Sequence, residues 1–180
     1  SLSDGMGSGE SAKRESEHLI ELLEQFLEAG MSRDTAMKMI NSAAVFESRS
    51  YSTLDVCAVD LYSGNCELHK CGVAPTFVLH GGEVDVIRCA QGPMGVFHHI
   101  ETQGYTCRLA DGDYVVMVTD GALEALPGEK KEEAFGSLIK SLECGSPKEM
   151  ASQIMDRLLG ECGGEAKDDM TVFVAGIWQK

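Results

Sequence analysis

Three short acidic segments, far apart in the chain, carry residue types that bind divalent cations. Asp4 lies in the glycine-rich segment 3–9, Asp120 follows an apolar run, and Asp168 and Asp169 precede another apolar run. A glycine follows both Asp4 and Asp120, which lets a ligand approach the backbone and leaves a carbonyl oxygen available. Hard cations such as Mg²⁺ and Mn²⁺ prefer carboxylate and carbonyl oxygens, with water completing the shell. The sequence therefore predicts a cation site if the fold brings the segments together.

Each acidic segment is weak evidence by itself, because an Asp-Gly pair occurs most often in a turn. Their order along the chain makes the combination more specific. A strand-like apolar run leads into Asp120, and another leads out of Asp169. Both carboxylates would then project from the ends of a rigid sheet.

Two other sites fit the glycine-rich opening poorly. A phosphate-binding P-loop has a lysine after its last glycine, but Glu10 follows Gly9 here. An EF-hand loop needs an oxygen ligand two residues after its first aspartate, where Met6 stands. Neither a nucleotide site nor an EF-hand is expected.

The histidines and methionines have ordinary structural interpretations. His98 and His99 are adjacent, and neighbouring side chains on a strand point to opposite faces, so a turn or surface pair is favoured over a shared metal. Three further histidines stand alone and are interpreted as structural: His18, His69 and His80. Met37, Met39 and Ile40 could form a partner-binding face, although filling the core is the commoner role of methionine.

Composition limits the class of protein and of partner. The chain has 180 residues, of which 43% are hydrophobic and 24% charged, as in one folded domain. Its net charge of −14 argues against nucleic acid or an anionic membrane surface as the main partner, because both repel a polyanion. We expect one domain over residues 1–180: a motif plus two helices (1–50), a sheet region (51–130), and helices with a last strand (131–180).

Cysteine usage predicts a reducing compartment. The chain has 7 cysteines, an odd number without any Cys-x-x-Cys pair, which argues against a disulfide framework, a zinc ribbon or a thioredoxin-type motif. Most have apolar neighbours, as buried free thiols do. The longest apolar run, residues 114–118, is far shorter than the roughly 20 residues of a membrane span. We therefore expect a cytoplasmic domain, without a span or a signal peptide.

Apolar residues at helical spacing predict four helices. The first covers residues 11–29 and ends at Gly30, and Ser32 can cap the second. A third is centred on residues 135–142. The fourth begins at Ser146, where a proline at the first helical position and a capping box mark the start.

After the second predicted helix, the spacing of apolar residues changes to the alternation that is typical of strands. The predicted strands are 54–61, 66–71, 75–80, 83–88, 105–109, 114–119 and a closing strand at 170–178. Glycine-containing turns join several of them as hairpins, which predicts an antiparallel sheet. The segment 114–119 is apolar throughout, which favours a central strand. Helices, then strands, then helices is an α+β order.

The ordered motifs resemble those of the metal-dependent serine/threonine phosphatases of the PP2C type. These motifs are Asp4-Gly5-Met6-Gly7, Thr119-Asp120-Gly121 and Asp168-Asp169-Met170-Thr171. Segments 3–9, 52–55, 72–75 and 93–95 more closely resemble the family of phosphatase domains of stage II sporulation protein E. The resemblance covers essentially the whole chain. It implies an antiparallel β-sandwich flanked by helices, with two metals, manganese or magnesium, at one end.

The resemblance also implies roles for single residues. Asp4 would bridge both metals, and Gly5 would offer its carbonyl oxygen to one of them. Asp120 and Asp168 would complete the shell of the other metal, so Asp4, Asp120 and Asp168 are the expected catalytic residues. Asp169 stands where many relatives have asparagine, and a supporting role is assigned to it. The implied chemistry is hydrolysis of a phosphomonoester by a metal-activated water, without a phosphoenzyme.

One departure from the family pattern concerns the start of the chain. Family members carry a further acidic metal ligand on strands before the Asp-Gly motif, and only residues 1–3 precede Asp4 here. We expect a piece of a longer protein that lacks the first strands and the phosphate-gripping residue, with weak metal binding and little or no activity. An uncovered sheet edge would invite pairing with a second copy, hence a homodimer.

The resemblance finally implies a biological setting. The expected substrate is a phosphorylated anti-sigma factor antagonist in sporulation, and the parent protein would be membrane-anchored and act on the cytoplasmic face near the division septum. Two alternatives stay open: a catalytically silent interaction module of the same fold, and a phosphatase for another stress-response regulator or a small phosphomonoester.

In the family, the helices after the Asp-Gly motif move to assemble the metal site. A similar switch is a hypothesis here, because glycines join helix 11–29 to Asp4.

Overall fold

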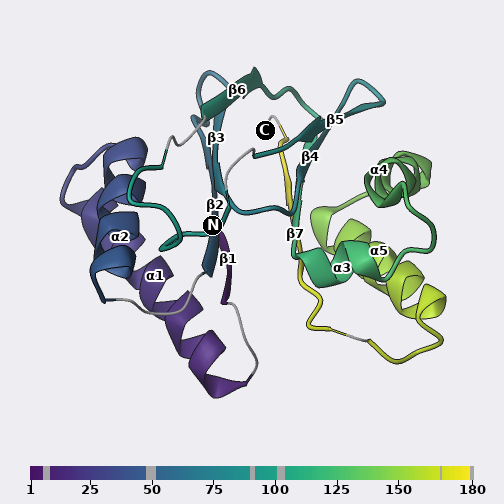
Figure 1. Cartoon of the computed structure of the whole chain (residues 1–180). Coiled ribbons are helices and arrows are strands. Elements are labelled where there is room, and N and C mark those ends of the chain that lie inside the picture. Colours follow the sequence, from purple (N-terminus) through teal and green to yellow (C-terminus); the bar gives the residue numbers. More distant parts are fainter. Residues whose placement is uncertain (6–8, 48–51, 90–91, 101–103, 167, 179–180) are drawn as a thin grey trace. The chain divides into compact units, whose positions relative to one another are not determined.

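The computed structural model describes residues 1–5, 9–47, 52–89, 92–100, 104–166 and 168–178. The chain divides into two compact units (Figure 1). The first comprises Ser1–Val73 and Cys89–Cys107, and the second comprises Ala74–Arg88 and Arg108–Lys180. Each unit has its own four-stranded sheet and its own apolar core.

The sheet of the first unit has the strand order β1-β2-β3-β6. Its strands are β1 (Leu2–Gly5), β2 (Ser52–Val59), β3 (Asn65–Cys71) and β6 (Gly104–Arg108). β2 pairs antiparallel with both β1 and β3. The β2–β3 turn is held by Asp60, whose Oδ1 accepts hydrogen bonds from the backbone N–H groups of Tyr62 and Ser63 at 2.8 and 3.1 Å. The predicted hairpin is confirmed.

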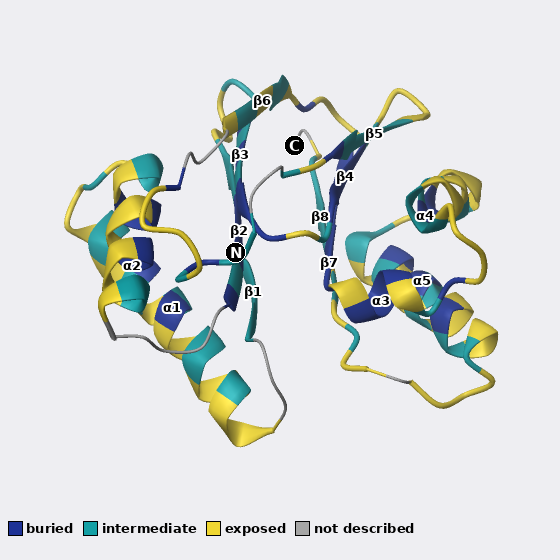
Figure 2. Ribbon diagram, viewed as in Figure 1, coloured by how far each residue is buried: buried dark blue, intermediate teal, exposed yellow. Residues whose placement is uncertain are grey.

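Two helices supply the apolar core of the first unit together with β2. They are α1 (Glu10–Glu28), which packs on β1 and β2, and α2 (Arg33–Glu47), which packs on α1. The buried stripes of both helices are visible in Figure 2. Leu23, Ile40 and Leu54 are almost completely buried. Met37 fills this core as interpreted from the sequence, whereas 44% of Met39 is exposed.

The sheet of the second unit has the order β5-β4-β7-β8. Its strands are β4 (Thr76–His80), β5 (Glu83–Ile87), β7 (Tyr114–Val118) and β8 (Val172–Gly176). β7 pairs antiparallel with β4 on one side and with β8 on the other, and all of its residues are buried. The continuous apolar run therefore forms a central strand, as predicted.

Three helices belong to the second unit. They are α3 (Asp120–Glu124), α4 (Lys131–Ser141) and α5 (Pro147–Glu161). The rings of Phe77 on β4 and Phe135 on α4 pack with their centroids 4.7 Å apart in the core. Ser146 caps α5 by accepting a hydrogen bond from the Glu149 N–H at 3.2 Å, as predicted. The Glu149 carboxylate bonds back to the N–H of Gly145, one residue earlier than in the usual capping box.

The elements follow the predicted α+β order, with two antiparallel sheets and flanking helices. Two short elements escaped prediction: β1 and α3, with 4 and 5 residues. Neither is long enough to display a hydrophobic period. In the described part of the chain, no helix combines the length and the hydropathy that a bilayer crossing requires.

The cysteines are free thiols, but fewer are buried than the sequence suggested. Only Cys66 and Cys71 are buried, and the other five are half-buried. Burial raises the pKa of the Cys71 thiol to about 12. The expectation that most cysteines lie in the interior is therefore wrong, because apolar neighbours along a strand alternate between a buried and an accessible face.

Candidate metal centre

Two of the three acidic segments meet in the second unit, where β7 ends and β8 begins. Asp120 is the first residue of α3, directly after β7, and the Asp168-Asp169 pair lies shortly before β8. Val118 at the end of β7 pairs with Val172 at the start of β8. In an antiparallel pair, residues that follow one strand lie beside residues that precede the other.

Thr119 fastens these two segments to each other. Its backbone N–H donates to the Thr171 carbonyl oxygen at 3.2 Å, and its Oγ1 accepts from the Thr171 N–H at 2.9 Å. The same hydroxyl donates to the Asp169 carbonyl oxygen at 3.3 Å. Thr119 is buried, so water competes little for these bonds. The two acidic segments are thus held by backbone as well as side-chain contacts.

Gly121 lets the segments approach this closely. A Cβ atom on Gly121 would lie 2.4 Å from the Asp169 carbonyl oxygen and 3.2 Å from the Cβ of Asp168. Real side chains do not tolerate the first of these distances, so only glycine fits. The glycine after Asp120 was expected to make room for a ligand. It makes room for the backbone of the second acidic segment.

The carboxylates of Asp120 and Asp168 are suited to a hard cation. Both residues are exposed. Oδ1 of Asp120 accepts from the Gly121 N–H at 2.9 Å, and Oδ1 of Asp168 accepts from the Asp169 N–H at 2.8 Å. Among the described residues, Oδ2 of either side chain has no hydrogen-bond partner. Two accessible oxygens on a fixed backbone are what Mg²⁺ or Mn²⁺ would take.

Asp4 belongs to the first unit and is half-buried near the end of β1. It pairs with Thr53 on β2, whose Oγ1 accepts from the Asp4 N–H at 3.1 Å. Ser3 donates its hydroxyl to the Thr53 carbonyl oxygen at 2.8 Å. A Cβ atom on Gly5 would lie 2.3 Å from the Ala12 carbonyl oxygen of α1. The position of Asp4 is therefore tied to β2 and, through Gly5, to α1.

A buried ion pair lies on the face of this sheet that also carries Asp4, and it was not predicted from the sequence. Asp55 on β2 pairs across the strands with Lys70 on β3, and their side chains form a salt bridge with only 6% and 3% of the residues exposed. Asp55 stands two residues beyond Thr53, the partner of Asp4, so the two aspartates point to the same face. Burial raises the pKa of the Asp55 carboxyl, and the Lys70 ammonium works against that shift. Opposite charges at Asp55 and Lys70, inside two consecutive predicted strands, were the signal for this pair.

The other residues singled out from the sequence form no further site in the part of the chain that the structure describes. His98 and His99 are exposed and lie outside regular elements, as interpreted from the sequence. Met6 and its neighbours 7 and 8, and Lys167, lie outside the described residues. In the described part of each unit, no three His, Cys, Asp or Glu side chains gather as a metal-ligating group. Asp4 on one side, and Asp120 with Asp168 on the other, are each held in place within their own unit.

Comparison with known sequences identifies one family. The family model described as Stage II sporulation protein E (SpoIIE) matches residues 1–178. Stage II sporulation protein E of Bacillus subtilis (strain 168) is 32% identical over 179 residues, and that of Priestia megaterium is 34% identical over 182 aligned positions. Both alignments cover 98% of this chain. The chain spans 22% and 31% of the length of these two relatives.

Comparison with solved structures supports the fold. The structure of the PP2C phosphatase domain of SpoIIE from Bacillus subtilis, with a fragment of its regulatory domain, matches with a TM-score of 0.90 and 33% identity. The match covers 97% of this chain and 53% of that one. The predicted PP2C-like fold class is confirmed.

Proposed function

Because the chain belongs to the stage II sporulation protein E (SpoIIE) family of PP2C-type serine/threonine phosphatases, we propose that it hydrolyses phosphoserine or phosphothreonine on a protein. The observation that carries this proposal is the meeting of Asp120 and Asp168 in the second unit. Two segments far apart in the sequence are fastened by Thr119, and both leave a carboxylate oxygen free for a cation.

The proposed metal ligands are the residues that the motifs single out. Asp4 and the Gly5 carbonyl oxygen would be the ligands that the first unit supplies, and Asp120 and Asp168 would be the ligands that the second unit supplies. All of these donors are oxygen atoms, which favours Mn²⁺ or Mg²⁺ over softer metals. When bound, the cations supply an acidified water and positive charge against the phosphoryl oxygens.

Backbone groups of the chain itself orient the carboxylates of the proposed metal ligands. The Gly121 and Asp169 N–H groups each donate to the Oδ1 of the preceding aspartate, which fixes the carboxylate rotamer and turns the other oxygen outward. Asp169 contributes its backbone: its carbonyl oxygen accepts from Thr119 and its N–H orients Asp168. This supports the auxiliary role proposed for Asp169. No serine, cysteine or histidine nucleophile is needed.

The finer assignment of substrate rests on the family relationship. We propose a phosphorylated anti-sigma factor antagonist as substrate, in a pathway that controls a sigma factor during sporulation. A parent protein anchored in the membrane would present this domain on its cytoplasmic face. The net charge of −14 disfavours nucleic acid as a partner. A phosphoprotein carries its charge locally, at the phosphoryl group that the cations neutralise.

The test is Mn²⁺-dependent hydrolysis of p-nitrophenyl phosphate and of a phosphoserine protein. It is run on the 180-residue chain and on a chain extended by whatever its gene encodes upstream of Ser1. Asp120→Asn should abolish turnover in any active form, because it removes a negatively charged metal ligand. Asp156→Asn, an exposed aspartate on α5, is the control and should leave turnover unchanged.

Three outcomes decide between the hypotheses. Turnover that depends on Mn²⁺ and on Asp120 supports the phosphatase proposal. Turnover that survives Asp120→Asn contradicts the assigned ligands. Stable binding of the antagonist protein without turnover by either chain, and unaffected by Asp4→Asn, would point to a silent interaction module instead.

A further inference from the structure

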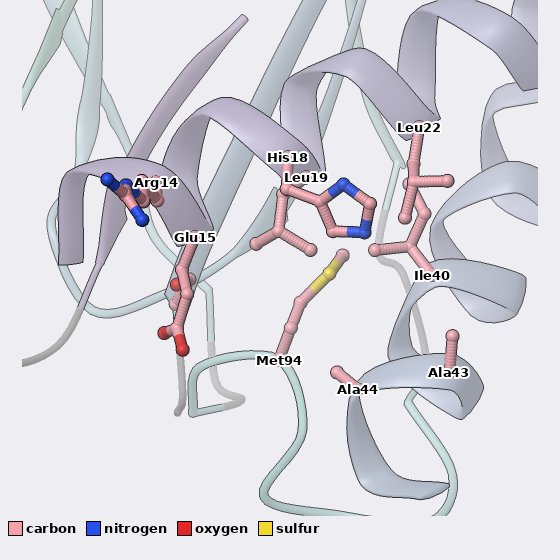
Figure 3. Close-up of a pocket in the computed structure, with 10 residues that line it drawn as sticks. Arg14, Glu15, His18, Leu19, Leu22, Ile40, Ala43, Ala44 and Met94 are labelled. Atoms are coloured by element: carbon pink, nitrogen blue, oxygen red, sulfur yellow. The ribbon is translucent and has the colours of Figure 1, made fainter. Parts of the chain in front are cut away.

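Cysteine side chains from three strands gather on one face of the sheet of the first unit. Cys57 lies on β2, Cys66 on β3 and Cys107 on β6. The Sγ atoms of Cys57 and Cys66 are 3.7 Å apart, and the Cys107 thiol also interacts with that of Cys66. The other face of β2 packs against α1 and α2. The cavity of about 120 Å³ between these helices is lined by none of the three thiols (Figure 3).

The thiols of Cys57 and Cys66 differ in accessibility and in acidity. Cys57 is half-buried, whereas Cys66 is completely buried. A hydrogen bond from the Cys66 thiol lowers the pKa of Cys57, although partial burial works against this shift. The same hydrogen bond, together with burial, raises the pKa of Cys66. Because the thiolate is the nucleophile, Cys57 is suited to react first with an oxidant and Cys66 to react second.

The strand register places these two cysteines diagonally and not directly opposite each other. Leu68 is the residue opposite Cys57, and Val59 is the residue opposite Cys66. The backbones of diagonal neighbours are about 7–8 Å apart, slightly more than a relaxed disulfide spans. A bridge between them therefore draws β2 and β3 together and is strained. Strained disulfides are readily reduced again, which is typical of regulatory bridges.

Metal binding by the three thiols is disfavoured. Soft metal ions bind thiolates, and the raised pKa of Cys66 opposes its ionisation. Among the residues that the structure describes, no three His, Cys, Asp or Glu side chains are arranged to hold a metal ion. In a reducing compartment, by contrast, the disulfides that do form are usually transient, and many of them sense oxidants. The thiol pair is therefore suited to reversible oxidation.

We propose that Cys57 and Cys66 form a reversible disulfide when the chain meets hydrogen peroxide. The Cys57 thiolate attacks one peroxide oxygen, the O–O bond breaks, and hydroxide leaves as Cys57 becomes a sulfenic acid. The Cys66 sulfur then attacks the Cys57 sulfur, and the S–O bond breaks. The departing hydroxyl takes the Cys66 proton and leaves as water, while the hydroxide takes the proton that Cys57 had lost. The two sulfurs together lose two electrons, which the peroxide gains.

This modification site is independent of the phosphatase proposal, because none of the thiols is a proposed metal ligand. Reduction follows by thiol–disulfide exchange with a small thiol, which attacks one sulfur of the bridge and is itself oxidised.

The test treats the native 180-residue chain with hydrogen peroxide, blocks the remaining thiols, and maps disulfides after unfolding. Chymotrypsin cleaves after Tyr62, which lies between the two cysteines, so a Cys57–Cys66 bridge keeps two peptides joined until they are reduced. We expect this bridge as the main product, with two of the 7 thiols lost and restored by dithiothreitol. A bridge from Cys66 to Cys107, bridges only between chains, or no bridge at all would overturn the proposal.

Variants separate the thiol that reacts first from the one that reacts second. Cys66→Ala should prevent the bridge and leave a sulfenic acid at Cys57, which dimedone traps as an added mass. Cys57→Ser should prevent the bridge and slow oxidation by about tenfold, because it removes the thiol whose pKa is lowered. Cys144→Ser, at a half-buried cysteine of the second unit, is the matched control and should leave bridge formation unchanged.

Circular dichroism shows whether each variant is folded, and the mapping of the unchanged chain depends on no variant. In the Cys66→Ala chain, a dimedone adduct on any residue other than Cys57 would contradict the assigned order of attack.

Discussion

The two units hold their acidic residues in different ways. In the second unit, Asp120 and Asp168 extend from a central strand and its neighbour, and Thr119 and Gly121 lock them together. In the first unit, Asp4 lies on β1, a 4-residue strand at one end of the order β1-β2-β3-β6. This strand pairs with β2 and packs on α1 through Gly5. A central strand fixes side chains by pairing on both sides, whereas the place of Asp4 depends on how α1 packs.

The cores of the units differ as well. The core of the second unit is a continuous apolar cluster around β7. The apolar core of the first unit includes Leu54 and Val56, whereas the buried Asp55–Lys70 ion pair lies on the opposite face of the sheet, which also carries Asp4. A buried ion pair is costly to desolvate and costly to break. The stability of the first unit should therefore be sensitive to substitutions that change charge, and that of the second unit to substitutions that change side-chain shape.

The largest expected effect tests the ion pair. Lys70→Met should lower the free energy of unfolding by about 3–5 kcal/mol, because it leaves the Asp55 carboxylate buried without its partner. Urea unfolding followed by circular dichroism measures this. Lys148→Met, on an exposed position of α5, should change stability by less than about 0.5 kcal/mol. Combining Lys70→Met with Asp55→Leu should recover most of the loss, and a single variant as stable as the parent chain would refute the argument.

The next effect tests the close approach in the second unit. Gly121→Ala should cost about 1–3 kcal/mol, because its methyl group would collide with the Asp169 backbone. It should also weaken Mn²⁺ binding by displacing Asp168, which isothermal titration calorimetry would detect. Gly160→Ala is the control, since a methyl group there meets nothing within 4 Å. In its helical position it should stabilise the chain by about 0.5 kcal/mol.

A smaller effect tests the joint before α1, which is the glycine-containing segment 5–9 that links Asp4 to the helix. Gly9 precedes the helix with φ 79° and ψ −156°, a conformation that side chains disfavour, and no side chain caps the helix there. Gly9→Ala should cost on the order of 1 kcal/mol. Under the switch hypothesis it should also change Mn²⁺ affinity, because the joint sets where Asp4 lies.

Gly128→Ala is the matched control for that joint. Gly128 has φ 86° and equal room for a methyl group, but it lies in the second unit, between α3 and α4. It should cost a similar amount of stability and leave Mn²⁺ affinity unchanged. If the two variants behave alike in Mn²⁺ binding, the switch hypothesis loses its support.

The smallest effect concerns pH and the β2–β3 turn. Hydrogen bonds from the Ser63 and Tyr62 N–H groups hold the pKa of Asp60 below its usual range. A lowered pKa in the folded state stabilises the turn above the ordinary carboxyl pKa, and this contribution is lost as the pH falls through the folded value. NMR titration of the Asp60 carboxyl should give a midpoint below that of a free aspartate. Asp60→Asn should remove the pH dependence of the turn.

Local patterns predicted most of the elements and the types of residue in the proposed metal centre. Helical stripes, the cap at Ser146 and the apolar run of β7 depend on residues close together in the sequence, so they could be read from it. The motifs around Asp4, Asp120 and Asp168 likewise indicated oxygen ligands for a cation. The short elements β1 and α3 were missed because they form through contacts with other segments.

The sequence by itself therefore determined the α+β class, the helices and the chemistry of the acidic motifs. Tertiary structure alone decided that Thr119 joins Asp169, that Gly121 touches the second acidic segment, and that Lys70 meets Asp55. It also decided that the thiols of Cys57 and Cys66 lie beside each other. The physical reason is strand register and helix packing: a shift of one residue along a strand turns every side chain to the other face.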